Sequence, residues 1–161
     1  MKTVRTIDQK EITGIIDYLS HNILHSKLYN GPFNPQIIVT LAKGGFIPAR
    51  ILAKSLNINT ILSYGISFYD KNNVKTKNPI VYQDLTSCKE FLQDKNILIV
   101  DDIADSGHSI NNCVKHLMYD IGVKNENIRT CCIFKKDRSS VTPHYYFDSV
   151  DYDTWINFPW E

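Results

Sequence analysis

The chain lacks any strong excess of charge and any long apolar run. Its 18 lysines and arginines offset 17 acidic residues, and the net charge is +1 over 161 residues. Such a balance gives no field that would attract nucleic acid or an anionic membrane. No stretch approaches the roughly 18 consecutive apolar residues of a membrane span. The N-terminus continues into a mixed polar segment, which predicts no secretory signal. We therefore expect neither a nucleic-acid partner nor an integral membrane span.

Cysteines are few, and their spacing is not that of a metal site or a disulfide framework. The four are Cys88, Cys113, Cys131 and Cys132, with no C-x-x-C pair among them. Adjacent Cys131 and Cys132 would point to opposite faces of a strand. Reduced thiols are the better interpretation, and they predict a cytoplasmic protein.

Signatures of common nucleotide-binding folds, internal repeats and linkers are also missing. Neither G-x-G-x-x-G nor G-x-x-x-x-G-K-[ST] occurs, which disfavours a Rossmann or P-loop protein. Apolar residues make up 43% of the chain, as is ordinary for a globular protein. The length suits one domain with a sizeable core, so we predict a single domain over residues 1–161.

The most informative stretch runs from Ile97 to Ser109. Four apolar residues, Ile97 to Val100, lead into the adjacent carboxylates Asp101 and Asp102. A third carboxylate, Asp105, precedes Ser106 and Gly107, and the apolar residues after Ser109 recur at helical spacing. This order predicts a buried parallel strand, an acidic turn, a small-residue loop and a helix.

The chemistry of that stretch suits a phosphorylated sugar. Open parallel sheets bind ligands beyond the carboxyl ends of their strands, where Asp101 and Asp102 are expected. The helix start after Gly107 offers backbone N–H groups to a phosphate, and Ser106 and Ser109 can add hydroxyl donors. Carboxylates suit ribose hydroxyls or Mg²⁺ better than phosphate. The alternative is a solvated acidic turn that caps a helix.

A second turn of the same kind follows the predicted strand 37–41. Ala42-Lys43-Gly44-Gly45 leads into a helix that runs through Leu56, with Pro48 near its start. Gly-Gly turns are mostly simple turns, but beside the acidic loop this one becomes a candidate phosphate site. Lys43 supplies charge, and the glycines permit close backbone approach.

The remaining pattern predicts an amphipathic helix over residues 8–25 and strands over 60–68, 128–134 and 145–150. Ile121-Gly122 ends the helix that follows the acidic loop. Between these elements, residues 69–79 are polar and locally basic. They are either a solvated hairpin tip or a mobile lid whose lysines close over an anionic ligand.

Val100 to Gly107 resembles the phosphoribosyl-pyrophosphate (PRPP) loop of type I phosphoribosyltransferases. Ser106 replaces the usual Thr, and His108 stands where Gly is common. The resemblance implies an α/β fold with a mostly parallel twisted sheet flanked by helices, a flexible lid loop and a small C-terminal hood that binds the base. It implies Mg²⁺ held by Asp102 and a cis peptide at the Lys43 turn. It places PRPP contacts at Lys43, Gly44, Lys75, Asp101, Asp102, Ile103, Ala104, Asp105, Ser106, Gly107, His108 and Ser109.

The ending, Asp153-Thr154-Trp155-Ile156 followed by Pro159-Trp160-Glu161, resembles that of the bacterial xanthine-guanine phosphoribosyltransferases. The resemblance covers roughly residues 35–161. It implies transfer of the 5-phosphoribosyl group from PRPP to xanthine, guanine or hypoxanthine in purine salvage. Within the purine site Lys136 would donate a hydrogen bond to O6, and Trp155 would stack on the purine. The backbone at Trp155 and Ile156 would contact the substituent at position 2. Asp105 would act as the catalytic general base near N7.

Several interpretations accompany this prediction. For Lys135 and Arg138 we favour a solvated face over a contact with the ligand. For Trp160 we favour packing in the core or at a subunit interface. Relatives imply a homodimer or homotetramer. The alternatives are a type I enzyme for a different base and a non-enzymatic regulator that senses PRPP on the same fold. The second would need a basic stripe or a helix-turn-helix pattern, which the sequence lacks.

Overall fold

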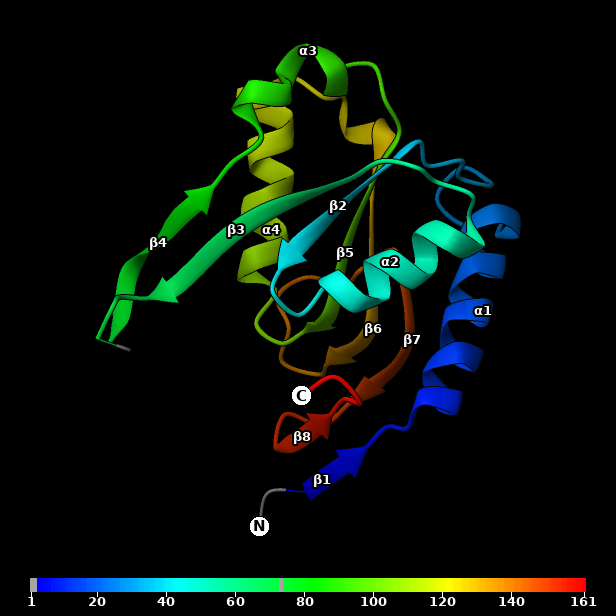
Figure 1. Cartoon of the computed structure of the whole chain (residues 1–161), viewed down its shortest axis with the longest axis vertical. Helices are drawn as coiled ribbons and strands as arrows, with labels where there is room; N and C mark the ends of the chain where they lie inside the picture. Colours follow the sequence, from blue (N-terminus) through cyan, green and yellow to red (C-terminus); the bar gives the residue numbers. More distant parts are fainter. Residues whose placement is uncertain (1–2, 73) are drawn as a thin grey trace.

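The fold is built on one six-stranded sheet, seen in the computed structural model of residues 3–72 and 74–161 (Figure 1). The strand order is β4-β3-β2-β5-β6-β7. The five neighbouring strands β3, β2, β5, β6 and β7 pair in parallel. The edge strand β4 is antiparallel to β3. The bounds are β2 Ile37–Ala42, β3 Ile61–Tyr69, β4 Lys75–Gln83, β5 Ile97–Ala104, β6 Ile128–Lys136 and β7 Tyr145–Val150.

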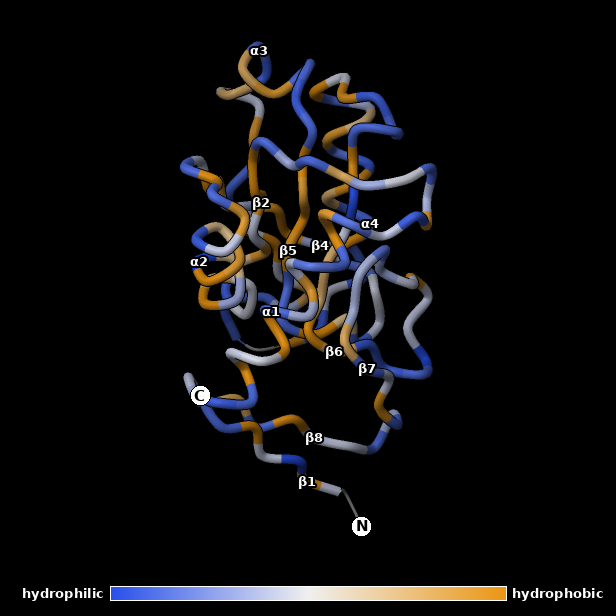
Figure 2. The backbone as a smooth tube through the Cα atoms, turned by 90° about the vertical axis from the view of Figure 1, so that its right-hand side faces the viewer, coloured by the Kyte–Doolittle hydropathy of each residue, from blue (hydrophilic) through white to orange (hydrophobic). Residues whose placement is uncertain are grey.

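Helices cover the two faces of the sheet. On one face α1 (Gln9–His25) and α2 (Phe46–Ser55) pack in a core with Leu98 and Val100 of β5. On the other, α4 (His108–Lys115), its π-helical continuation η2 (His116–Ile121) and α3 (Lys89–Leu92) pack in a core with Ile97 and Ile99. Alternate residues of one apolar strand therefore serve both cores. Figure 2 shows the hydrophobic colour concentrated along these central strands.

Helix α1 confirms the predicted helix over residues 8–25. Asp8 is its N-cap, and its side chain accepts a hydrogen bond from the Glu11 backbone N–H at 2.7 Å. The apolar residues that predicted the helix are buried against the sheet, namely Ile12, Ile15, Ile16, Leu19 and Ile23. The helix after the acidic loop ends as predicted, at Gly122 with a φ of 91°.

Two central strands extend beyond their predicted ends. The acidic turn that we expected at Asp101 is wrong in detail, because β5 continues to Ala104. Strand β6 likewise continues to Lys136. The ladder between these strands persists past the apolar residues, with Asp101 opposite Cys132 and Ile103 opposite Phe134. Backbone pairing to a neighbouring strand thus holds polar residues in extended conformation.

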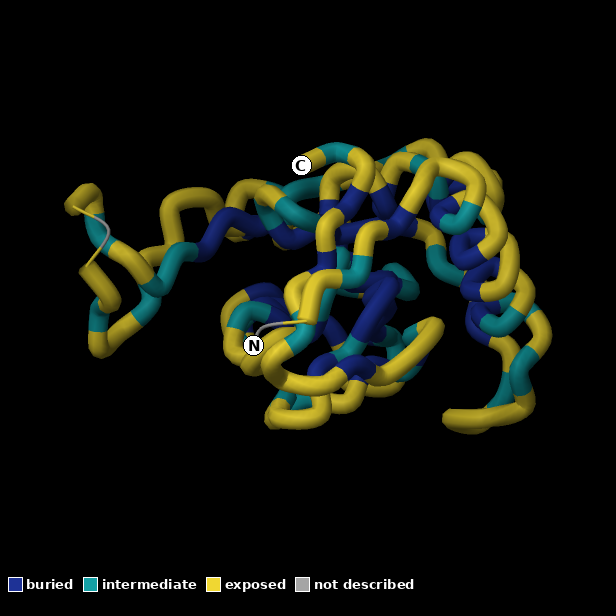
Figure 3. The backbone as a smooth tube through the Cα atoms, turned by 90° about the horizontal axis from the view of Figure 1, so that it is seen from below, coloured by how far each residue is buried: buried dark blue, intermediate teal, exposed yellow. Residues whose placement is uncertain are grey.

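The polar segment 69–79 forms the end of a β-hairpin, which is the geometry of the first of its two predicted interpretations. Strand β4 begins at Lys75, and the Asp70 carboxylate accepts hydrogen bonds from the Asn72 and Val74 N–H groups at 2.8 and 2.9 Å. The β3–β4 arm reaches away from the body of the molecule (Figures 1 and 3). Residue 73 lies outside the described residues. The short helix η1 (Thr86–Cys88) follows the arm.

Two short strands were not predicted. β1 (Thr3–Thr6) and β8 (Thr154–Asn157) pair in parallel as a separate two-stranded sheet, with Val4 opposite Trp155 (Figure 1). This sheet and the residues up to Glu161 form the C-terminal hood. A further short helix, η3 (Asn125–Asn127), precedes β6. Over the described ranges, the helices are too short or too polar to cross a membrane.

Candidate active site

The turn after β2 packs directly on the carboxylates of β5. The peptide between Ala42 and Lys43 is cis, as the resemblance implied. The Gly45 N–H donates to the Leu41 carbonyl at 3.0 Å and closes the turn. A Cβ placed on Gly44 would overlap the Asp102 carboxylate, so only glycine lets this backbone lie so close to the acid.

Asp101 and Asp102 form a partly buried acidic pair with different surroundings. Asp101 Oδ1 accepts from the Asp102 N–H at 3.0 Å, and Asp102 Oδ1 accepts from the Ile103 N–H at 2.7 Å. Burial raises the pKa of Asp101 well above its ordinary value, and the Asp102 charge adds to this. Burial also raises the pKa of Asp102, with Glu161 contributing. Two cavities adjoin the pair: Asp102 lines the larger of these two, called the large cavity below, and Asp101 lines the small one.

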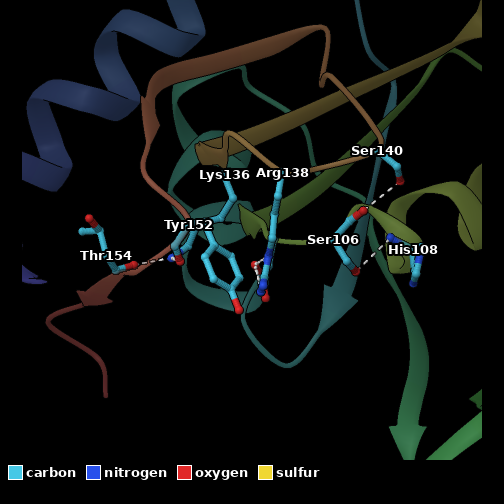
Figure 4. A network of polar contacts seen from close by, with 8 residues as sticks. Ser106, His108, Lys136, Arg138, Ser140, Tyr152 and Thr154 are labelled. Atoms are coloured by element: carbon cyan, nitrogen blue, oxygen red, sulfur yellow. Dashed lines mark hydrogen bonds and ion pairs between the residues drawn. The ribbon is translucent and has the colours of Figure 1, made fainter. Parts of the chain in front are cut away.

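The small cavity lies in the loop between β5 and α4. Its volume is about 70 Å³. Gly107 has a φ of 82° and begins α4, so the loop turns sharply into the helix. The Ser106 carbonyl accepts from the Ser140 N–H at 3.0 Å and from its hydroxyl at 2.8 Å, which fixes the loop to the β6–β7 connection (Figure 4). The residues that line the small cavity are Asp101, Ile103, Ala104, Asp105, Ser106, Gly107, Ser109 and Ile110.

The large cavity joins this loop to the end of β6 and to the hood. Its volume is about 320 Å³. Parallel strands β5 and β6 both end at its rim, which is where ligands bind in such sheets. Its lining residues are Asp102, Ile103, Asp105, Lys136, Arg138, Tyr152, Asp153, Trp155, Ile156, Phe158 and Glu161.

Lys136 is 7% exposed and holds the hood in place. Its ammonium group donates to the Tyr152 carbonyl at 3.0 Å and to the Thr154 carbonyl (Figure 4). An ammonium has three N–H donors, so one remains for a ligand after these two bonds. The geometry is compatible with the predicted contact between Lys136 and a carbonyl oxygen of a base.

The two hood tryptophans have different surroundings. Trp155 is 57% exposed and lines the cavity, so its ring is available to a planar ligand. Ile156 beside it is buried in the core. Trp160 stacks on Phe158, with ring centroids 4.7 Å apart and planes 7° apart. The packing role that we predicted for Trp160 is confirmed.

Arg138 is exposed, as we predicted, but its side chain also makes contacts that we did not predict. The Nε and Nη2 groups of Arg138 both donate to Asp105 Oδ1, at 3.0 and 2.7 Å. The guanidinium carbon also lies 3.7 Å from the centroid of the Tyr152 ring. Figure 4 shows Arg138 beside Tyr152, and both residues line the large cavity. The sequence held no local signal for this pair, because Asp105 and Arg138 lie in different loops.

Four of the predicted PRPP contacts are outside both cavity linings, namely Lys43, Gly44, Lys75 and His108, although Gly44 lies against Asp102. Lys43 is exposed in the β2 turn, and the His108 ring packs near Phe68, with centroids 5.8 Å apart. Lys75 is exposed at the start of β4, in the arm. The structure thus brings together the acidic loop, Gly44 and the hood, while Lys75 stays apart from them.

The donor set fits a Mg²⁺ ion that arrives with a phosphorylated ligand. Within residues 3–72 and 74–161, no three His, Cys, Asp or Glu side chains are grouped to hold a metal. Mg²⁺ commonly uses one or two carboxylates, with substrate phosphates and water completing its shell. Asp102 and Asp101, whose pKa values are raised by burial, would gain from a nearby cation.

Comparison with protein families gives a match over nearly the whole chain. Residues 7–161 match the phosphoribosyl transferase domain family. The xanthine-guanine phosphoribosyltransferase of Gluconobacter oxydans is 30% identical over 132 residues, which are 82% of this chain and 71% of the relative. The hypoxanthine-guanine phosphoribosyltransferase of Schizosaccharomyces pombe is 26% identical and covers 89% of this chain and 88% of its own.

Solved structures agree. A purine phosphoribosyltransferase from Pyrococcus horikoshii is 28% identical, with a TM-score of 0.74 over 98% of this chain and 94% of that one. A hypothetical protein from Neisseria gonorrhoeae with bound ppGpp is 27% identical, with a TM-score of 0.79 over 100% and 90%. Together with the acidic loop, the Lys-Gly-Gly turn and the mostly parallel sheet, these matches show that the chain belongs to the phosphoribosyl transferase domain family, as a type I phosphoribosyltransferase.

Proposed function

We propose that this chain transfers the 5-phosphoribosyl group of PRPP to a 6-oxopurine and releases pyrophosphate, as a purine salvage enzyme. The observation that carries the proposal is the composition of the large cavity. Asp102, Asp105, Lys136 and Trp155 come from three separate parts of the chain and line one space of about 320 Å³. A sugar site at the acidic loop and a base site at the hood would then be adjacent, as transfer between them requires.

The ribose phosphate would occupy the acidic loop. The 5′-phosphate suits the helix start at Gly107, where Ser106 and Ser109 add hydroxyls. Asp101 and Asp102 would accept hydrogen bonds from the ribose hydroxyls. The backbone at Gly44 lies against Asp102, so pyrophosphate at the Lys43 turn would be next to the ribose. Lys75 would add charge to the pyrophosphate only when the arm closes over the ligand, as the lid interpretation of residues 69–79 predicts.

The base would occupy the hood. The free N–H of Lys136 would donate to O6 of xanthine, guanine or hypoxanthine and would disfavour adenine, whose exocyclic amine is itself a donor. Trp155 would stack on the purine, a contact worth about 1–3 kcal/mol per base in nucleic-acid sites. The backbone at Trp155 and Ile156 would read the substituent at position 2.

The reaction breaks the bond between the ribose carbon and pyrophosphate, which leaves with the electron pair, and forms a bond to a purine nitrogen. The protein positions the two partners and stabilises the charge that develops on the ribose. Asp105 would take up the purine proton near N7 as general base. Mg²⁺, held by Asp102 and the substrate, would neutralise the pyrophosphate.

The direct test is a spectrophotometric assay with PRPP, Mg²⁺ and xanthine, guanine, hypoxanthine or adenine. We expect turnover with at least one 6-oxopurine and little with adenine. Equal turnover of adenine would contradict the role of Lys136, and no turnover with any base would contradict the proposal.

A matched pair of glycine variants tests the pyrophosphate site. In Gly44→Ala the new methyl group overlaps Asp102, so we expect the KM for PRPP to rise at least tenfold. In Gly14→Ala the methyl group meets nothing within 4 Å, so kinetics should stay unchanged. Equal kinetics for both variants would remove the Lys43 turn from the site.

A further inference from the structure

We infer that Arg138 is a positioning residue for the reaction and that it ties the general base to the segment that recognises the purine. The inference rests on the proposed function, because it concerns the same cavity. Arg138 follows β6 in the connection to β7, and Asp105 lies in the loop between β5 and α4. Their side chains meet at the wall of the cavity. Arg138 is two positions after Lys136, the proposed O6 donor.

The hydrogen bonds leave one carboxylate oxygen of Asp105 for a ligand. Two guanidinium N–H groups converge on Oδ1, at 3.0 and 2.7 Å. Oδ2 accepts no hydrogen bond from residues 3–72 or 74–161. Because two N–H groups of Arg138 hold Oδ1 in place, Oδ2 is left as the oxygen that can receive the proton near purine N7.

One face of the guanidinium lies against Tyr152, in the segment that leads into the hood. Its carbon lies 3.7 Å from the centroid of the Tyr152 ring, a stacking contact that lysine does not reproduce. The Tyr152 carbonyl in turn accepts from Lys136. Arg138 and Lys136 therefore hold the same segment, which leads directly into β8 and Trp155. A shift of the hood on base binding would reach Asp105 through Arg138.

Stability alone does not account for this arrangement. The Arg138 and Asp105 side chains are 43% and 50% exposed. Ion pairs exposed to this extent contribute about 0–1 kcal/mol to folding. An ordered fork-shaped contact with little effect on stability, located at the wall of the reaction cavity, has its main consequence in orienting Asp105.

The test compares Arg138→Met, Asp105→Asn and the double variant with the wild type. We expect Arg138→Met to lower kcat roughly 10- to 100-fold, within the range typical of general acid–base groups, with the KM for PRPP within twofold. The double variant should lose at most about twofold more than Asp105→Asn, because Arg138 acts through Asp105. Arg138→Lys should recover only part of kcat, since lysine keeps the charge and loses the fork.

Arg50→Met provides the control, because Arg50 is an exposed arginine of α2 away from the cavity lining. It should match the wild type in kcat, KM and Tm. An Arg138→Met variant with kcat within twofold of the wild type would overturn the inference, as would losses that multiply in the double variant. If the wild type turned over no base, the proposed function itself would fail. If the wild type were active but the Arg138 variants did not show the expected losses, the proposed function would stand and this inference would fail.

Discussion

Asp102 is an ionisable side chain held where its ionised form is unfavourable. Burial raises its pKa, and nearby Glu161 adds to the effect. A folded-state pKa above the unfolded value means that ionisation at neutral pH costs folding free energy, and that this cost disappears as the pH falls through the folded pKa. A neutral amide of the same size avoids the cost. Asp102→Asn should therefore raise Tm at pH 7.5 by roughly 2–4 °C, the shift that about 1 kcal/mol produces in a domain of this size.

The pH dependence of the Tm difference between Asp102→Asn and the wild type tests the direction of this stabilisation. Differential scanning fluorimetry of both proteins at decreasing pH should show the Tm advantage of Asp102→Asn shrinking as the pH approaches the raised pKa of Asp102 in the wild type. His144, whose pKa is lowered to about 4 by burial and Arg129, is common to both proteins and cancels in the difference. The variant should lose turnover. A lower Tm for the variant at pH 7.5 would contradict the prediction.

The residues of the acidic loop could be predicted from the sequence because their signal is local. Asp101, Asp102, Asp105, Ser106 and Gly107 lie within one short stretch whose order is specific. The Arg138 contact could not be predicted in the same way. It joins residues 33 positions apart, and it forms only when β5 and β6 pair and their following loops meet. Contacts between loops that are distant in sequence therefore cannot be predicted from local sequence patterns, even when both loops border the site.

The elements show the same division. Strands β2 and β5 and helix α1 were predicted because buried apolar residues at period 2 or 3.6, or in an unbroken run, mark them. Strands β1 and β8 were missed because each has four residues, none of them buried in β1 and one buried in β8. Their extended form depends on pairing with each other across almost the whole chain length. A strand that exists through a non-local partner carries little sequence signal of its own.

That pairing makes β1 a support for the base site. Val4 and Arg5 are opposite Trp155 and Ile156, and the Ile7 N–H donates to the Asn157 carbonyl at 3.0 Å. Removing residues 2–6 would leave β8 without a partner strand. We expect the KM for the purine to rise about tenfold, while the KM for PRPP stays within twofold, because the acidic loop lies on β5 and α4. Steady-state kinetics with each substrate varied in turn measures both.

Arg5→Met separates backbone pairing from side-chain contacts. Arg5 forms exposed ion pairs with Glu11 at 3.0 Å and Asp148 at 3.4 Å, and each is worth about 0–1 kcal/mol. The substitution keeps the strand, so purine KM should remain close to that of the wild type. If Arg5→Met reproduced the effect of the truncation, the side-chain contacts and not the β1–β8 sheet would support the hood.

At the scale of the whole molecule, ligand and metal should stabilise the fold only together. A ligand at about 100 times its Kd adds about 2.7 kcal/mol to the free energy of unfolding. In a domain of this size that corresponds to a Tm rise of roughly 5–11 °C. We expect this shift from PRPP with Mg²⁺. Mg²⁺ alone should give less than about 1 °C, because the described residues contain no group of three candidate metal ligands.

The same argument fixes how the metal dependence should change with Asp102. If Mg²⁺ reaches the site with PRPP and Asp102 is its protein ligand, EDTA should reduce the shift given by PRPP in the wild type and have little further effect in Asp102→Asn. The acidic pair is already unfavourable when both members are ionised, so a cation that screens it strengthens binding on the protein side as well as on the phosphate side. A full shift with Mg²⁺ alone would mean that the protein carries a preformed metal site, and an equal EDTA effect in both proteins would place the ion on the substrate without Asp102.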